Sequence, residues 1–161
     1  MPLFTLSLTA TTEGCTLSIA DPATFPLRVK FQCISCREEA PKYAVLSLGD
    51  GKQEIPGGRG EATYVAKCSA CKAVGSADLL SVLGAALGGE GGSAAPVPVA
   101  KLECRGLEPV AWQAGDGWRV ASTASAATWE ASFMEEAEFT EYDEESAASV
   151  EASGVAGVWS K

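Results

Sequence analysis

Histidine is absent from the 161-residue sequence. Its absence excludes Ser-His-Asp and Cys-His catalytic machineries, every imidazole metal ligand and the usual general base near neutral pH. Most familiar hydrolase designs are therefore excluded, and any metal ligand has to come from another residue type.

Long hydrophobic runs and basic signal segments are also missing. The longest mostly apolar stretch, residues 79–87, is far shorter than the ~20 residues that a membrane helix needs. Residues 1–12 carry no basic residue before their apolar positions, whereas a secretory signal begins with positive charge. The sequence has neither a coiled-coil heptad nor an apolar stripe for self-association. We therefore expect a soluble monomer in the cytoplasm, with the nucleus as an alternative, and no membrane partner.

Basic residues are scarce and unevenly placed. The chain has 12 Lys and Arg against 21 Asp and Glu residues, a formal net charge of −9. Residues 1–80 contain eight residues of each sign, so the whole excess lies in residues 81–161. Such an acidic segment repels nucleic acid and is typical of solvated surface or of a face for a basic partner. A modest basic patch within residues 28–72 leaves nucleic-acid binding as the least favoured of the functions considered.

Apolar residues make up 47% of the chain, enough for a core, and they alternate with polar residues along much of it. The alternation is clearest at residues 4–8, 27–31 and 129–133. Further strand candidates, mostly bounded by turn-forming residues, are 17–20, 43–48, 62–67, 97–104, 118–122 and 155–159. Residues 76–87 fit either a short helix or a buried strand ending near Gly84, and we favour the strand. These patterns predict an all-β protein.

Residues 88–98, GGEGGSAAPVP, have almost nothing to bury. We expect a flexible loop there, dividing the chain into residues 1–90 and an acidic portion, residues 91–161. The two portions share short similar strings: RVKFQC with VAKLEC, and EATYVAKC with AATWEASF. An internal duplication and a chance match explain these similarities about equally well.

Two C-x-x-C pairs, Cys33 with Cys36 and Cys68 with Cys71, carry the most specific chemical signal. Each pair can form a tight turn, or knuckle, that presents two thiolates, and two knuckles complete a tetrahedron around Zn²⁺. Four ligands saturate the ion and leave no position for an activated water or a substrate. We therefore expect one structural zinc and no enzymatic activity.

Thiol redox activity, disulfides and an iron–sulfur cluster are the less favoured alternatives to zinc at these cysteines. Thiol redox activity would need a pair at a helix start in a βαβ unit, and disulfides would need an oxidising compartment. An iron–sulfur cluster is typical of a different cysteine spacing. The two remaining cysteines, Cys15 and Cys104, are expected to be buried small hydrophobes outside the zinc site.

Several charged side chains are candidates to assist or supplement this site. Four thiolates on Zn²⁺ leave a charge of −2, which Arg37, Lys72, Lys67 and Arg59 are placed to offset, with solvated surface as the alternative. Arg59 lies in a glycine-rich turn, where we favour an architectural role over anion binding. Residues 142–145, of which Asp143, Glu144 and Glu145 are acidic, are expected to be solvated rather than to bind a hard cation.

Four sequence blocks together resemble the eukaryotic family of CXXC-motif-containing zinc-binding proteins. They are KFQCISC at residues 30–36, GGRGEA followed by KCSAC within residues 57–71, ECRGLEPV at 103–110 and TEYDEESAASV at 140–150. The blocks occur in order over nearly the whole chain, and ECRGLEP is too unusual to be a general zinc-ribbon feature. The sequence departs from the family in its Gly- and Ala-rich stretch at 84–95 and in its Ala-rich C-terminal region.

The resemblance implies an elongated, almost entirely β protein of two similar small subdomains, with zinc-ribbon-like knuckles in the first. It implies one zinc bound by Cys33, Cys36, Cys68 and Cys71, and no established enzymatic activity. Our leading hypothesis is a non-enzymatic zinc protein that engages a protein partner. The alternative is a metal-homeostasis protein that exchanges zinc or copper through its thiolates.

Overall fold

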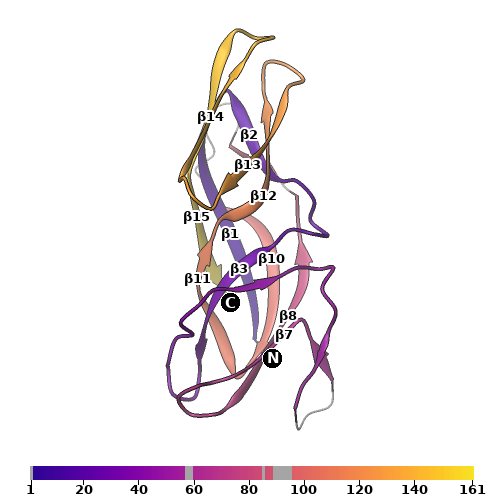
Figure 1. The fold of residues 1–161 in the computed structure, drawn as a ribbon, viewed down its shortest axis with the longest axis vertical. Helices are drawn as coiled ribbons and strands as arrows, with labels where there is room; N and C mark the ends of the chain where they lie inside the picture. The colour runs from indigo at the N-terminus through magenta and orange to yellow at the C-terminus, as the bar shows by residue number, and fades with distance from the viewer. Residues whose placement is uncertain (1, 57–59, 85, 89–95) are drawn as a thin grey trace.

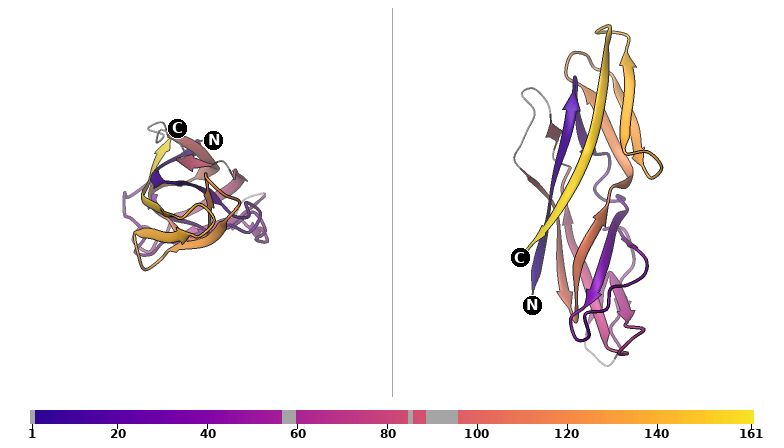
Figure 2. Two further views of the ribbon diagram at one scale, coloured as in Figure 1. Left: turned by 90° about the horizontal axis from the view of Figure 1, so that it is seen from above. Right: turned by 90° about the vertical axis from the view of Figure 1, so that its left-hand side faces the viewer.

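A computed structural model describes residues 2–56, 60–84, 86–88 and 96–161. The molecule is elongated and is built from strands, with no helix in these ranges (Figures 1 and 2). Accordingly, the described part of the chain contains no helix long and apolar enough to cross a membrane.

A six-stranded antiparallel sheet is the largest sheet among the described residues. Its strands, in spatial order, are β14 (Glu138–Asp143), β15 (Ala148–Ser160), β1 (Leu3–Glu13), β10 (Val97–Arg105), β8 (Val74–Val82) and β7 (Tyr64–Lys67). The two longest strands, β1 and β15, pair in opposite directions, with Thr5 beside Ser160 and Glu13 beside Glu151. The two ends of the chain therefore lie side by side, as the right-hand view of Figure 2 shows.

Three smaller sheets complete the fold. One contains β11 (Leu107–Gln113), β3 (Leu27–Cys33) and β4 (Ala44–Leu46); the second contains β13 (Thr128–Phe133), β12 (Gly115–Ser122), β2 (Cys15–Ile19) and β9 (Leu87–Gly88). The third pairs β5 (Gln53–Glu54) with β6 (Glu61–Ala62). The three larger sheets each combine strands from before and after residue 90, because β1 pairs with β10, β3 with β11 and β2 with β12.

The core follows from the alternation in the sequence. Strand β3 alternates strictly between buried and half-buried residues, and β1 does so over most of its length, as expected for strands with one face on a core. Most of the buried hydrophobic side chains form one cluster. Trp118 is 1% exposed and makes edge-on ring contacts with Phe25, Trp112 and Phe133. These contacts connect β12 to β11, to β13 and to the segment between β2 and β3.

The all-β prediction is confirmed, and so is the favoured strand within residues 76–87: β8 begins at Val74 and ends at Val82, two residues before Gly84. The predicted loop at residues 88–98 is too long at both ends, because Gly88 belongs to β9 and Val97 and Pro98 belong to β10. Residues 89–95 of that loop lie outside the described residues, as does Arg59 of the glycine-rich turn.

The prediction that residues 142–145 form a solvated acidic turn is wrong for Asp143. This residue ends β14 and is 1% exposed. Its carboxylate accepts hydrogen bonds from the hydroxyls of Ser122 (2.6 Å), Ser125 (2.6 Å) and Ser146 (2.7 Å), which lowers its pKa well below the ordinary range. A buried carboxylate is stable here because the three hydroxyls satisfy its charge. Asp143 thus joins the β12–β13 connection to the β14–β15 turn.

Candidate metal centre

The first C-x-x-C pair forms a tight turn at the end of β3. The backbone N–H of Cys33 donates to the carbonyl of Glu38 at 3.0 Å, and the N–H of Arg37 donates to the carbonyl of Cys33 at 2.9 Å. Arg37 is in the left-handed region, with φ of 66°. This conformation is uncommon for residues other than glycine, so the turn is held by its own hydrogen bonds rather than by local preference.

The second pair repeats this turn between β7 and β8. The N–H of Cys68 donates to the carbonyl of Ala73 at 2.8 Å, and the N–H of Lys72 donates to the carbonyl of Cys68 at 2.9 Å. Lys72 has φ of 68°, matching Arg37 of the first turn. The two knuckles therefore have the same backbone geometry, although their sequences differ at every position except the cysteines.

The two knuckles bring all four predicted cysteines together. The Sγ atoms of Cys33 and Cys71 are 3.7 Å apart, those of Cys36 and Cys68 are 3.5 Å apart, and all four lie within 4.8 Å of one another. A regular tetrahedron with Zn–S bonds of about 2.3 Å has sulfur–sulfur edges of about 3.8 Å. The donor set and its spacing therefore fit one zinc ion.

Backbone N–H groups favour the charged form of the first cysteine in each knuckle. The backbone N–H groups of Cys36 and Ser35 stabilise the thiolate of Cys33 and lower its pKa to about 6. In the second knuckle, the backbone N–H groups of Cys71 and Ala70 lower the pKa of Cys68. At Cys36 the N–H of Glu38 acts in the same direction, but partial loss of hydration and the neighbouring sulfurs outweigh it and raise the pKa to about 12. The knuckles thus supply part of the positive potential that a thiolate site needs.

The cationic side chains next to the knuckles make other contacts. Nη1 of Arg37 lies 3.2 Å from Oε1 of Glu108, and Nζ of Lys72 donates to the carbonyl of Ser69 at 3.1 Å. Lys67 is exposed at the end of β7. Lys72 therefore bonds to the backbone of its own knuckle, whereas Arg37 pairs with a side chain of β11.

The ECRGLEPV block supports the first knuckle. Its Gly106 has φ of 74°, and a Cβ atom there would lie 3.0 Å from the carbonyl oxygen of Val74. The carbonyl of Gly106 accepts a hydrogen bond of 3.2 Å from the N–H of Ile34, between the two cysteines of the knuckle. This close approach explains why the β10–β11 turn needs glycine. Sequence reasoning recognised the block as unusual but had no signal for this contact.

The four cysteines differ in exposure. Cys33 is buried and Cys68 is partly buried, whereas Cys36 and Cys71 are exposed. A metal ion bound here would therefore be covered by protein on one side and would face solvent on the other.

The other two cysteines are separate from this cluster. Cys15 and Cys104 are each 0% exposed. The Sγ of Cys15 donates to the carbonyl of Glu151 at 3.2 Å, and burial raises the pKa of Cys104 to about 12. A buried thiol with a raised pKa is unreactive, which agrees with the expected packing role.

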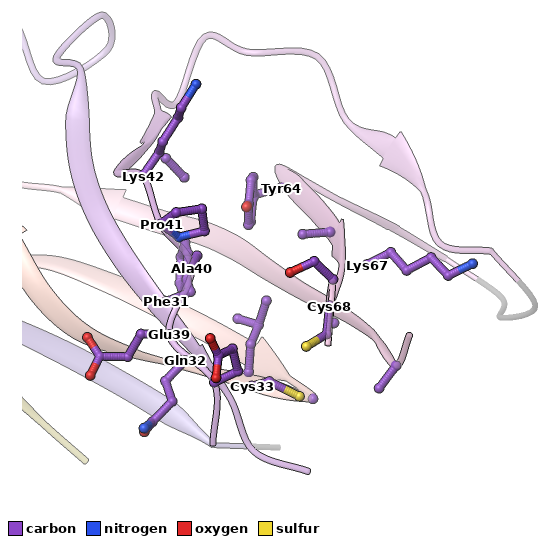
Figure 3. Close-up of a pocket in the computed structure, with 18 of the residues that line it drawn as sticks. Phe31, Gln32, Cys33, Glu39, Ala40, Pro41, Lys42, Tyr64, Lys67 and Cys68 are labelled. Atoms are coloured by element: carbon purple, nitrogen blue, oxygen red, sulfur yellow. The ribbon is translucent and has the colours of Figure 1, made fainter. Parts of the chain in front are cut away.

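A cavity of about 350 Å³ adjoins the cysteine cluster. Cys33 and Cys68 form part of its lining, and Phe31 and Tyr64 lie farther from the knuckles (Figure 3). The rings of Phe31 and Tyr64 are stacked, with centroids 5.1 Å apart and planes at 13°. Nothing in the sequence pattern predicted this cavity, because its walls come from different sheets.

Comparisons with known proteins agree with this description. The family model for eukaryotic CXXC motif containing zinc binding proteins matches residues 5–159. The mouse and human proteins named CXXC motif containing zinc binding protein are 32% and 31% identical over 145 residues, which is 90% of this chain and 89% of each relative.

Two solved structures have the same fold. The crystal structure of C1orf123 superimposes with a TM-score of 0.83 and 30% identity, covering 99% of both chains. A hypothetical protein from Plasmodium falciparum superimposes with a TM-score of 0.79 at 16% identity, covering 99% of this chain and 100% of that one. By its sequence, its fold and its converging cysteines, the chain belongs to the eukaryotic family of CXXC motif containing zinc binding proteins.

Proposed function

We propose that the protein binds one zinc ion through Cys33, Cys36, Cys68 and Cys71, that this zinc is structural, and that the protein serves as a non-enzymatic interaction module. The observation that carries the proposal is that the two knuckles belong to different sheets. The first follows β3 of the three-stranded sheet, and the second joins β7 to β8 of the six-stranded sheet.

A metal ion at this position joins the two sheets at one end of the molecule. Strands β4 and β7 are the terminal strands of their sheets, so each pairs with only one neighbouring strand. Zinc bound to four thiolates contributes on the order of 10 kcal/mol to a folded metal site, and it closes the long connection between the knuckles. The expected role is to hold this end in one arrangement.

The same donor set argues against catalysis. Four thiolates fill the coordination sphere of Zn²⁺ and leave no position for water or substrate. A general base of ordinary type is also lacking, since the chain has no histidine. The zinc then serves to keep the surrounding surface folded. A stable surface of this kind favours recognition of another protein.

Metal content and thermal stability test this function together. Wild-type protein purified without added metal should contain one zinc per chain. The double variant Cys33→Ser with Cys68→Ser should lose the zinc and a large part of its stability, whereas Cys15→Ser with Cys104→Ser should keep the zinc. A metal-free wild type that retains its melting temperature would contradict a structural role.

Metal exchange is the second candidate function, and the exposure of Cys36 and Cys71 favours it. Exposed thiolates let an incoming ligand reach the ion without unfolding the protein, and thiolates also bind Cu(I). A chelator competition followed by both metal release and circular dichroism separates the two functions. Zinc that leaves while the fold stays intact favours exchange; zinc that leaves only as the protein unfolds favours the structural role.

A further inference from the structure

The cysteines of the metal centre form two close pairs, and both pairs cross from one knuckle to the other. Sγ of Cys36 lies 3.5 Å from Sγ of Cys68, and Sγ of Cys33 lies 3.7 Å from Sγ of Cys71. The sulfurs of a disulfide are about 2 Å apart, so each close pair has to shorten by about 1.5 Å to form one. The arrangement that suits a metal ion therefore also brings each sulfur near a partner on the other knuckle.

Exposure differs between the two members of each close pair. Cys36 and Cys71 are exposed, whereas their partners Cys68 and Cys33 are partly buried and buried. Cysteines bind a metal as thiolates, and a solvent-accessible thiolate next to a second cysteine is the usual arrangement of redox-sensitive sites. A small oxidant can therefore reach the exposed sulfur, and the covered sulfur beside it can complete a disulfide.

We propose that the metal centre is a redox switch, in which a hydroperoxide converts the two close pairs into two cross-knuckle disulfides and zinc is released. This inference rests on the proposed function, because it names a regulation of the same zinc site. The first knuckle follows the three-stranded sheet and the second belongs to the six-stranded sheet, so the disulfides keep the two sheets joined after the metal has left. A transient redox-sensing disulfide of this kind does not need an oxidising compartment.

The reaction consumes one hydroperoxide molecule for each close pair. The thiolate of Cys36 attacks one oxygen of hydrogen peroxide, the O–O bond breaks, and the other oxygen leaves as hydroxide, which a solvent proton converts to water. The thiolate of Cys68 then attacks the resulting sulfenic sulfur, forms the S–S bond and displaces a second hydroxide, which is also protonated. The two sulfurs lose two electrons and the peroxide gains them. After the second pair reacts in the same way, no thiolate remains to hold Zn²⁺.

The pairing decides how the oxidised protein behaves. Cys36 and Cys68 are 32 positions apart and Cys33 and Cys71 are 38 positions apart. Disulfides that close loops of this length restrict the unfolded chain and so stabilise the folded state. A disulfide within one knuckle closes a very short loop and leaves the two sheets unconnected. The oxidised, zinc-free protein is therefore expected to be more stable than the reduced, zinc-free protein.

Metal release is the first test. Zinc-loaded full-length protein is treated with a modest excess of hydrogen peroxide, and free zinc is followed with a colorimetric indicator. The protein should release one zinc per chain, and a thiol reductant with added zinc should restore the bound metal. Zinc that stays bound would overturn the proposal, and so would an oxidation that the reductant does not reverse.

Tryptic peptides identify the disulfides. Trypsin cleaves after Lys and Arg, so the cysteines of the first knuckle leave together in peptide 31–37 and those of the second in peptide 68–72. After free thiols are alkylated, cross-knuckle disulfides should hold these two peptides together, and fragment masses should assign the bonds to the two close pairs. Two separate peptides, each with an internal disulfide, would overturn the proposal. The opposite cross-knuckle pairing would also overturn it.

The buried cysteines provide the control. Cys15 and Cys104 are each 0% exposed, so both should stay reduced under peroxide and become alkylated only after unfolding. The double variant Cys15→Ser with Cys104→Ser should release zinc as fast as the wild type. Loss of peroxide-driven release in this variant would show that the oxidised thiols lie outside the metal centre, contrary to the proposal.

Melting temperatures complete the test and separate it from that of the structural role. The oxidised, zinc-free protein should melt at least about 5 °C above the reduced, zinc-free protein. Equal melting temperatures would overturn the switch. Zinc that resists peroxide while chelation still destabilises the protein refutes the switch and leaves the structural role standing. A wild type that lacks zinc contradicts the proposed function instead, and its tryptic peptides after peroxide treatment still test the pairing.

Discussion

The Sγ atoms of Cys33 and Cys71 lie 3.7 Å apart, although the residues are 38 positions apart and belong to knuckles on different sheets. Cys36 and Cys68 form the second such contact, at 3.5 Å. Each close contact therefore joins one knuckle to the other, and a metal ion bound among these sulfurs connects the two sheets.

Removal of the metal should loosen one end of the molecule more than the rest. The knuckles hold the ends of β3, β7 and β8, whereas β1 and β15 pair along most of their length. Hydrogen exchange measured before and after chelation should show a loss of protection in β3, β4 and β7, with β1 and β15 changing much less. Equal loss along the whole chain would show that the metal supports the entire fold instead.

Substitution of Arg37 should separate backbone strain from charge. Its ion pair with Glu108 is weak because the Arg37 side chain is 66% exposed, and such pairs contribute about 0–1 kcal/mol. Glycine removes the pair but is relaxed at φ of 66°, so Arg37→Gly should leave the melting temperature and zinc affinity nearly unchanged. Arg37→Val places a β-branched residue in the left-handed region and should weaken both. Strong loss in the glycine variant would mean that the guanidinium itself supports the site.

Gly157 of β15 should tolerate no side chain. A Cβ atom there would lie 2.9 Å from both Leu8 Cδ2 and Trp112 Cε3 and 3.0 Å from Leu6 Cδ1. Overpacking of this kind costs about 1–3 kcal/mol, which denaturant unfolding of Gly157→Ala should reveal. Gly51 is the matched control, because a Cβ atom there meets nothing within 4 Å. A neutral Gly157→Ala variant would show that the core relaxes around the new methyl group.

Asp143 should make stability depend on pH in the acid range. Its pKa is lowered in the folded state by hydrogen bonds from Ser122, Ser125 and Ser146, so the stabilisation is fully present above the unfolded pKa of about 4. It is lost as the pH falls further toward the folded pKa. Asp143→Asn should therefore be less stable than the wild type at pH 7, and this difference should shrink as the pH falls below about 4.

Glu144 provides the control for the Asp143 prediction. It is the next residue in the chain, it is exposed, and Glu144→Gln makes the same kind of change without touching the three serines. This variant should match the wild type at pH 7 and in the acid range. A difference between wild type and Asp143→Asn that stays constant down to pH 3 would show that the carboxylate charge contributes nothing.

Local pattern was enough to predict most strands but not their partners. The period-two alternation around Leu6 and Val29 marks strands with one buried face, and the structure has both. The acidic strand β14 escaped prediction because Glu138–Asp143 has few apolar residues to mark a buried face. It is a strand because β15 supplies a continuous edge for it to pair with.

At the metal centre too, the local sequence predicted some features, and others depended on the tertiary structure. The spacing of the two C-x-x-C pairs predicts the donor set, because four thiolates with short, similar spacings suit zinc wherever the chain brings them together. Their unequal exposure, the support of the first knuckle by Gly106 and the cavity at Tyr64 could not be predicted, since each depends on residues from several strands.

The sequence by itself determined the all-β class, the cysteine cluster and the family, because alternation, spacing and rare motifs are properties of short segments. Only the tertiary structure decided that β1 lies between β10 and β15, that Asp143 is buried among hydroxyls, and that β4 and β7 face one cavity. Strand partners are selected by the packing of side chains far apart in the chain, and a linear pattern does not record which distant strand completes a given face.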